Sequence, residues 1–230
     1  MRHHLALSAA IATSCAVLSG CGGGGSPNAL LQQAIKDGIA RGSVHESSLG
    51  GLGYGIATFT SDVTTDGGEQ DLTMDLGIDA HVIVAGDVAY VSGNTLFLEQ
   101  YVSAAEAHTI GDHWLEIPSS DSAYAGISDD VTLTSAMDDL KLTGPLSETA
   151  PMTVDGQSVV GITGTATLRD STSPGTGTVY VSRTGTPLPV AATYTYATGA
   201  TVNVILDHWG EHVAVHVPAN IFHVEQQTSA

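Results

Sequence analysis

The chain has 230 residues, and 24 Asp and Glu against 6 Lys and Arg give it a formal net charge of -18 at pH 7. So acidic a chain repels phosphate backbones, which excludes nucleic-acid binding. Hydrophobic residues make up 42% of the chain, which is too many for a disordered acidic tail. Its length predicts one globular domain or at most two small ones.

The N-terminus has the features of a signal peptide over residues 1–20. A short basic start precedes an apolar run, residues 5–18, that is short for a membrane-spanning helix. Leu18-Ser19-Gly20-Cys21 then places small residues directly before a cysteine. This pattern resembles the lipobox of a bacterial lipoprotein, in which Cys21 receives a diacylglyceryl group and the chain is cut before it. The alternative is an ordinary signal peptide followed by a free cysteine.

Acylation of Cys21 would make the lipid the only anchor. Each buried CH₂ of an acyl chain contributes about 0.8 kcal/mol, so two or more chains hold a protein stably at a membrane. Residues 21–27 then form the lipidated cysteine and a Gly-rich tether, and residues 28–225 form a single lipoprotein domain. Because Cys15 leaves with the signal, this domain has no thiol for a disulfide, a nucleophile or a zinc site.

The first half of the domain begins with a helix and continues as strands. Apolar residues at helical spacing predict a short amphipathic helix over residues 28–41. Alternating residues then predict strands around 54–58 and 72–76, and a hairpin over 81–91 that turns at Ala85-Gly86-Asp87. We expect a further strand over 95–100.

The middle of the chain mixes helical and extended patterns. Residues 102–108 predict a helical turn, and residues 111–118 predict a strand. Ser128, followed by Asp129 and Asp130, has the composition of a helix start, which would place Val131 to Leu140 on one helix.

The last third predicts an antiparallel meander. Asp155-Gly156 indicates a hairpin turn between residues 152–154 and 158–168. Further strands are expected at 178–182, 190–196, 201–206 and 212–217, with connections too short for parallel pairing. The fold class is therefore α+β, with an antiparallel sheet whose few helices leave part of its inner face curved over a cavity.

The chain contains no pattern typical of an enzyme. It has no phosphate-binding glycine loop and no nucleophile elbow. The pairs Asp129/Asp130 and Asp138/Asp139 fall on a predicted helix, where a solvated face is the better interpretation. We expect no catalytic residues, no enzyme activity and no cofactor.

The histidines raise the alternative of a metal site. His208, His212 and His216 are spaced by four, and His108, His113 and His223 add further imidazoles. Spacing of four forms one face only on a helix, whereas His212 and His216 fall on a predicted strand. We therefore expect no metal site, and a zinc hydrolase or metal carrier remains the least favoured hypothesis.

Several short motifs resemble one family of lipoproteins. After the lipobox come Gly86 to Val91 (GDVAYV), Gly111 to Pro118 (GDHWLEIP), Pro187 to Val190, Asp207 to Gly210 and Val215 to Pro218. Together they resemble the LppX/LprA/LprF/LprG family of actinobacterial lipoproteins over roughly residues 50–222. The resemblance implies a LolA-like half-barrel, with helices on its concave side, around an apolar cavity that holds acylated lipids or glycolipids.

The resemblance transfers no named site, so strand parity and helix face select the candidates. Their shared property is that they are apolar and face the expected concave side. The ligand-cavity candidates are Leu72, Met74, Val82, Val84, Phe97, Leu133, Met137 and Leu140.

These features lead to one functional hypothesis and one rival. We expect a monomeric lipoprotein, carrying palmitate or a similar acyl group on Cys21, at the extracytoplasmic face of the cell membrane. It would bind or carry a hydrophobic lipid or glycolipid without catalysis. The rival is an envelope scaffolding or partner-binding lipoprotein with a solid core, filled by residues such as Phe97, Trp114 and Met137, and no ligand.

Overall fold

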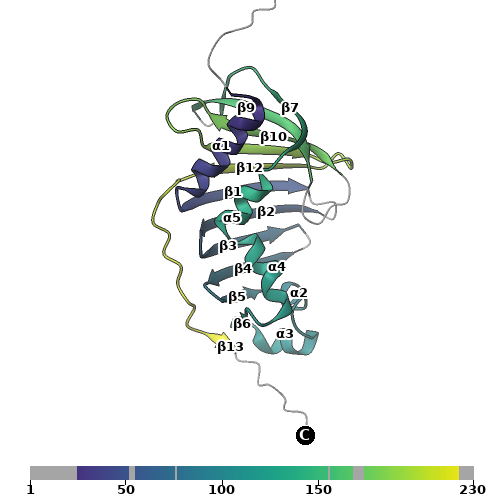
Figure 1. Cartoon of the computed structure of the whole chain (residues 1–230). Coiled ribbons are helices and arrows are strands. Elements are labelled where there is room, and N and C mark those ends of the chain that lie inside the picture. Colours follow the sequence, from purple (N-terminus) through teal and green to yellow (C-terminus); the bar gives the residue numbers. More distant parts are fainter. Residues whose placement is uncertain (1–24, 52–54, 76, 155, 168–173, 223–230) are drawn as a thin grey trace, which may run out of the picture.

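The computed structural model describes residues 25–51, 55–75, 77–154, 156–167 and 174–222. In this part of the chain, thirteen strands form one open, curved sheet with helices on one face (Figure 1). The main strand order is β13-β6-β5-β4-β3-β2-β1-β12-β11-β10-β9-β7, with β8 paired to β9. The predicted α+β class and half-barrel sheet are confirmed. Cys21 and the signal segment lie outside the described residues.

Helix α1 (Pro27–Ile39) confirms the first predicted element. Ser26 caps it, because its side chain accepts a hydrogen bond from the Ala29 amide, and Pro27 occupies the first turn, where its missing N–H costs nothing. The buried side of the helix presents Leu31, Ala34, Ile35 and Gly38 to the sheet and to helix α5.

The first meander contains six strands, each antiparallel to the next. They are β1 (Ser43–Gly51), β2 (Ile56–Thr64), β3 (Gly67–Met74), β4 (Ile78–Ala85), β5 (Val88–Gly93) and β6 (Trp114–Pro118). The predicted β4–β5 hairpin is confirmed, and its turn contains Gly86 with φ of 59°, a conformation that suits glycine. The sequence does not predict β1, whose run of small and polar residues lacks a hydrophobic alternation.

Two short helices between β5 and β6 correct the expectation of a strand over 95–100. Helix α2 (Thr95–Leu98) is capped by Asn94, whose side chain accepts from the Phe97 amide. Helix α3 (Ala104–Ile110), which fits the predicted helical turn, begins with a capping box between Ser103 and Glu106. The caps satisfy free amides that a strand would have to pair with a neighbour.

Two helices also replace the single helix predicted from Ser128. Helix α4 (Ser122–Asp130) starts at the Asp121 cap, so Ser128 belongs to its last turn. Helix α5 (Leu133–Asp139) starts at the Thr132 cap, which interrupts the apolar stripe predicted for one helix. Together they run over the sheet from β5 and β6 toward α1, which covers the β7 side (Figure 1).

The second meander confirms the predicted strands of the last third up to residue 207. It contains β7 (Thr143–Glu148), β8 (Met152–Val154), β9 (Gln157–Ala166), β10 (Gly175–Ser182), β11 (Pro189–Thr195) and β12 (Thr201–Asp207). β12 pairs antiparallel with β1, with His45 opposite Asp207 and Gly50 opposite Val202. This pair joins the two meanders into one sheet.

The predicted strand over 212–217 is wrong. After β12 the chain passes along one side of the sheet without secondary structure and ends in β13 (Ile221–Phe222), which pairs parallel with β6 (Figure 1). Both sides of β12 are already occupied, by β1 and β11, so no neighbouring edge is left for another strand there.

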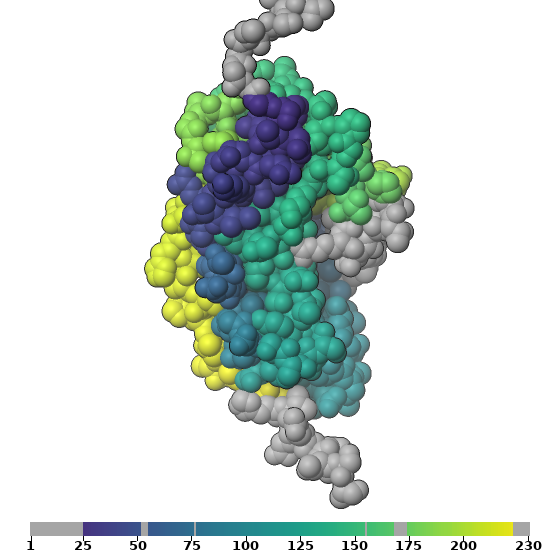
Figure 2. All heavy atoms as spheres, viewed as in Figure 1, coloured from purple at the N-terminus to yellow at the C-terminus, as the bar shows by residue number. Residues whose placement is uncertain are grey.

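The hydrophobic core lies between the sheet and its helices. Alternate residues of the strands face α1, α4 and α5, which cover this concave face in Figure 2, with α1 at one end. The C-terminal segment, yellow in the same view, runs along one side of the molecule.

A close contact between α1 and its neighbours predicts the effect of one substitution. A Cβ at Gly38 would lie 3.0 Å from the Met137 Sδ and from two atoms of the Trp209 ring. Neither neighbour can move easily, because Met137 is fully buried and the Trp209 Nε1 donates to the Pro189 carbonyl at 3.2 Å. We expect Gly38→Ala to lower the free energy of unfolding by about 1–3 kcal/mol in chemical denaturation.

Gly126→Ala is the matched control. Gly126 lies in α4, and a Cβ added there would have no described atom within 4 Å, so alanine should raise stability by about 0.5–1 kcal/mol. Stabilisation by both substitutions would contradict the tight packing of α1.

Candidate ligand-binding site

The structure brings most of the predicted cavity residues together on the concave face. Val82, Val84, Phe97, Leu133, Met137 and Leu140 belong to one buried cluster. Leu72 is half-buried and packs against this cluster, and Met74 is half-buried two residues further along the same face of β3. Strand β4 supplies two of the eight, and α5 with its C-terminal cap supplies three.

These side chains fill much of the space between the sheet and the helices. Leu133, Met137 and Leu140 are among the largest fully or almost fully buried side chains of the described chain. Trp114, which the solid-core hypothesis also named, is half-buried and stacks edge-on against His81, with ring centroids 5.0 Å apart. An acyl chain could reach the centre of the concave face only if α4 or α5 moved.

An open pocket lies at the β6 end of this interior. It has a volume of about 790 Å³, within the usual range for small-molecule sites. Its walls come from the segment after α2, from α3, from β6, from the start of α4 and from β13, and we call it the β6 pocket. It is lined by Glu99, Gln100, Tyr101, Val102, Ser103, Glu106, Leu115, Glu116, Ile117, Pro118, Asp121, Ala123 and Phe222.

The β6 pocket is continuous with the buried cluster. Leu115 and Ile117 line the pocket and also belong to the cluster, with 4% of each residue exposed. The rings of Phe97 and Tyr101 meet edge to face, with centroids 5.4 Å apart. Phe97, a predicted cavity residue, therefore lies directly behind the pocket wall.

The sequence patterns do not identify this pocket. Of its lining, only residues 115–118 lie in one of the family-like motifs, GDHWLEIP, which carries no predicted site. Because a strand was predicted over residues 95–100, the sequence patterns did not predict the pocket wall that the end of α2 and α3 form. The capping box Ser103-x-x-Glu106 is the available signal that a helix begins here.

Two tyrosines place polar groups inside the concave face. The Tyr194 hydroxyl donates to the Asp139 carbonyl at 2.9 Å, which ties β11 to the end of α5. Burial, and then the charges of Asp139 and Glu46, raise the pKa of Tyr194 well above its ordinary value of 10.0. Burial and Asp139 raise the pKa of Tyr196 to about 12. Both side chains are therefore neutral hydroxyls at neutral pH.

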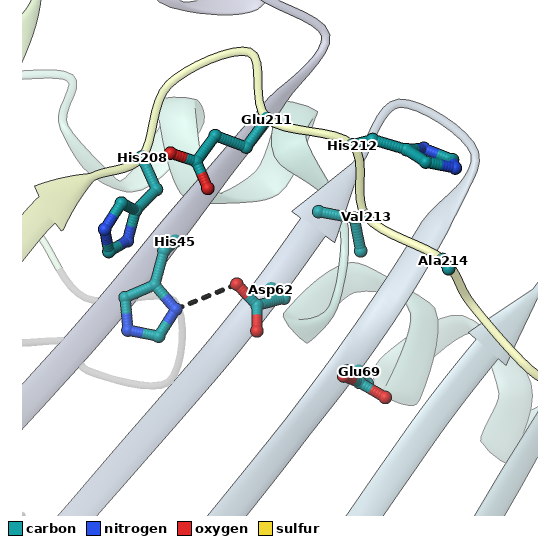
Figure 3. Close-up of a pocket in the computed structure, with 8 residues that line it drawn as sticks. All are labelled: His45, Asp62, Glu69, His208, Glu211, His212, Val213 and Ala214. Atoms are coloured by element: carbon teal, nitrogen blue, oxygen red, sulfur yellow. Dashed lines mark hydrogen bonds and ion pairs between the residues drawn. The ribbon is translucent and has the colours of Figure 1, made fainter.

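A second, smaller hollow of about 270 Å³ contains histidines (Figure 3). His45 lies 2.8 Å from Asp62, Nδ1 to Oδ1, and its ring meets His208 edge-on. Glu69, Glu211, His212, Val213 and Ala214 complete the lining. The hollow lies where the C-terminal segment passes the start of β1 and the end of β2.

The arrangement of the histidines gives no support to the zinc hypothesis. His208 and His212 share the hollow, whereas His216 is exposed beyond it and the His113 Nδ1 donates to the Ile110 carbonyl at 2.9 Å. His223 lies outside the described residues. Among the residues that the structure describes, no three His, Cys, Asp or Glu side chains are placed to hold a metal ion.

The helices of the described chain are short. None of them is long and apolar enough to cross a bilayer.

Two solved structures share this fold. LprF from Mycobacterium bovis matches with a TM-score of 0.58 and 14% identity, over 84% of this chain and 97% of that protein. The Mycobacterium tuberculosis lipoprotein LppX matches with a TM-score of 0.55 and 20% identity, over 82% of this chain and 99% of its own. The sequence itself matches no protein-family model and no curated protein. The similarity inferred from the short motifs is therefore confirmed as a similarity of fold.

The buried tyrosines predict a loss of stability in alkali. Because the folded state raises the pKa of Tyr194 and Tyr196, it binds these protons more tightly than the unfolded chain does. The contribution of the two tyrosines to the free energy of unfolding is complete below pH 10. It declines as the tyrosines of the unfolded chain ionise, and it continues to fall toward pH 12. Denaturant unfolding measured between pH 8 and 12 should show this decline.

Tyr194→Phe removes both the hydrogen bond and the ionisable hydroxyl of this residue. The loss of the hydrogen bond is measured at pH 8, and the loss of the ionisation is measured above pH 10. The variant should lose about 1 kcal/mol at pH 8, because the Asp139 carbonyl loses its donor. Its stability should then fall less steeply than that of the original chain above pH 10. Parallel pH curves for the two proteins would show that Tyr194 is not held neutral by burial.

Proposed function

We propose that this chain is a non-enzymatic lipoprotein that is anchored through acylated Cys21 and binds or carries a hydrophobic lipid or glycolipid in the cell envelope. The observation that carries the proposal is the β6 pocket, because its apolar floor is continuous with the core under the helices. The shared fold with LppX, which is named a lipoprotein, supports the same class.

The ligand enters through the β6 pocket in this proposal. Its acyl chain lies on Leu115 and Ile117 and extends past Phe97 toward the other predicted cavity residues. Deeper insertion displaces α4 and α5, which are held to the sheet by side-chain packing and by the hydrogen bonds of Tyr124 and Tyr194. Apolar burial by the ligand offsets the lost packing at about 25 cal/mol per Å².

The solid-core alternative also has a structural observation in its favour. Leu133, Met137 and Leu140 are already buried against the sheet, so the interior does not require a ligand. In that case the protein acts through its surface as an envelope scaffold or partner-binding module. The two functions differ in whether the purified protein holds a lipid.

The anchoring part of the proposal is tested with the two cysteines. In a lipoprotein-processing bacterial host, Cys21→Ser should abolish incorporation of labelled palmitate, because the thiol that receives the acyl group is removed. Cys15→Ser is the control, since Cys15 lies in the apolar run and should leave labelling unchanged. Palmitate labelling that survives Cys21→Ser would exclude this anchor.

The lipid-binding part is tested on the non-acylated Cys21→Ser protein by native mass spectrometry with organic extraction. We expect a bound lipid, and we expect Ala123→Phe to reduce its occupancy at least threefold, because Ala123 lines the β6 pocket. Ala125→Phe is the control, an exposed position on the same helix outside the pocket lining. A protein that is consistently empty would favour the scaffold.

A further inference from the structure

One wall of the β6 pocket is carried by a segment that arrives from β12, in the second meander. Residues 208–220 run along the side of the molecule without secondary structure and reach β6 only at β13 (Figure 1). There Phe222 becomes part of the pocket lining. We call residues 208–222 the C-terminal strap.

The strap is fixed firmly where it begins. The Trp209 Nε1 donates a hydrogen bond to the Pro189 carbonyl at 3.2 Å. The Gly210 amide donates to the Ser43 carbonyl at 3.1 Å, and the Ser43 hydroxyl donates to the Glu211 carbonyl at 2.6 Å. These bonds attach the first residues of the strap to β1 and β11.

The middle of the strap has no such attachment. In the described chain, no hydrogen bond or ion pair is found for residues 212–219. Val213, Val215 and Pro218 are half-buried, whereas the residues between them are exposed. Few hydrogen bonds and an exposed backbone are features of a segment that opens locally at a low free energy.

The end of the strap is held by a short pairing. β13 pairs with β6 at two positions, with Ile221 opposite Trp114 and Phe222 opposite Leu115. The Trp114 amide also donates to the Asn220 carbonyl at 2.8 Å. The pairing is parallel, which is slightly less stable per residue than antiparallel pairing.

The other walls of the pocket are held more firmly. β6 pairs with β5 at four positions. The start of α4 is capped by Asp121, and the Tyr124 hydroxyl of the same helix donates to the Gly86 carbonyl at 2.6 Å. Helix α3 buries Ala107 and Ile110 in the hydrophobic core. β13 is therefore the wall that separates most easily from the rest of the pocket.

We propose that the C-terminal strap is a gate. β13 separates from β6, Phe222 leaves the pocket, and a lipid enters or leaves at this edge of the sheet. This rests on the proposed lipid-binding function and describes how the same site opens. The bonds of Trp209 and Gly210 hold the start of the strap in place, while residues 212–219 absorb the movement. The pocket thus opens without displacement of α4 or α5.

A disulfide between β13 and β6 tests the gate directly. Trp114 and Ile221 do not line the pocket, because alternate residues of a strand point to opposite faces and Leu115 and Phe222 line it. Neighbouring strands lie about 4.8 Å apart, a Cα separation that a disulfide can span. Trp114→Cys with Ile221→Cys is introduced into the Cys21→Ser chain, which has no other cysteine once the signal segment is absent.

The double-cysteine protein is its own control, because its oxidised and reduced forms differ only in the crosslink. The probe is an uncharged, pyrene-labelled monoacylglycerol below its micelle concentration, followed by stopped-flow fluorescence. We expect association and dissociation of the probe to be roughly tenfold slower in the oxidised form, since binding then lacks the opening step. Equal rates in the two forms would overturn the gate.

Truncation removes the gate without a crosslink. A chain that ends at Ala219 lacks β13 and should bind the probe roughly fivefold faster than the full chain. A chain that ends at Phe222 keeps β13 and is the matched control, with an unchanged rate. Circular dichroism verifies that both chains fold. Unchanged or slower association in the shorter chain would overturn the gate, because Phe222 would then be a fixed part of the site.

Hydrogen exchange measures the opening without a ligand. The Trp114 amide donates across the junction between β6 and the strap, so its exchange reports their separation. We expect it to exchange at least tenfold faster than the amides of β4, which is paired on both sides. Equal protection would overturn the gate. Fast exchange with no probe bound by any form would instead overturn the lipid-binding function.

Discussion

The pairing of β1 with β12 is the constraint on which the rest of the structure depends. Each meander forms from strands that are close in sequence, but this pair brings His45 opposite Asp207, at the two ends of the domain. Without it the chain would form two separate sheets. With it, one curved face is wide enough for α1, α4 and α5 to pack on, and their packing buries the apolar residues of both meanders.

Within this continuous sheet, the described interior is a packed core in the middle and has an open pocket toward β6. In the middle of the sheet, α5 lies over the concave face and presents Leu133 and Met137 to it. Near β6 the cover consists of α2, α3 and the start of α4, which form the walls of an open pocket instead of a closed layer. A ligand therefore meets apolar surface first at this end of the sheet.

Sequence patterns predicted the elements whose burial follows a simple period. The alternation of Ile162 and Ala166 with Thr163 and Thr165 located β9, and the stripe of Leu31, Ala34 and Ile35 located α1. Alternation failed for residues 212–217, since periodicity says nothing about whether a neighbouring edge is free. Strand alternation was enough to predict which side chains face the concave side. It could not predict the β6 pocket, because Tyr101, Ala123 and Phe222 are far apart in the sequence and meet only in the folded chain.

The placement of α1 sets a distance between the anchor and the ligand site. Pro27 begins α1 over the second meander, whereas the β6 pocket lies at the other end of the molecule (Figure 1). Six residues, from Cys21 to Ser26, span at most roughly 20 Å when fully extended. An acyl group on Cys21 would thus hold the α1 end near its own leaflet and leave the mouth of the pocket free to face other components of the envelope.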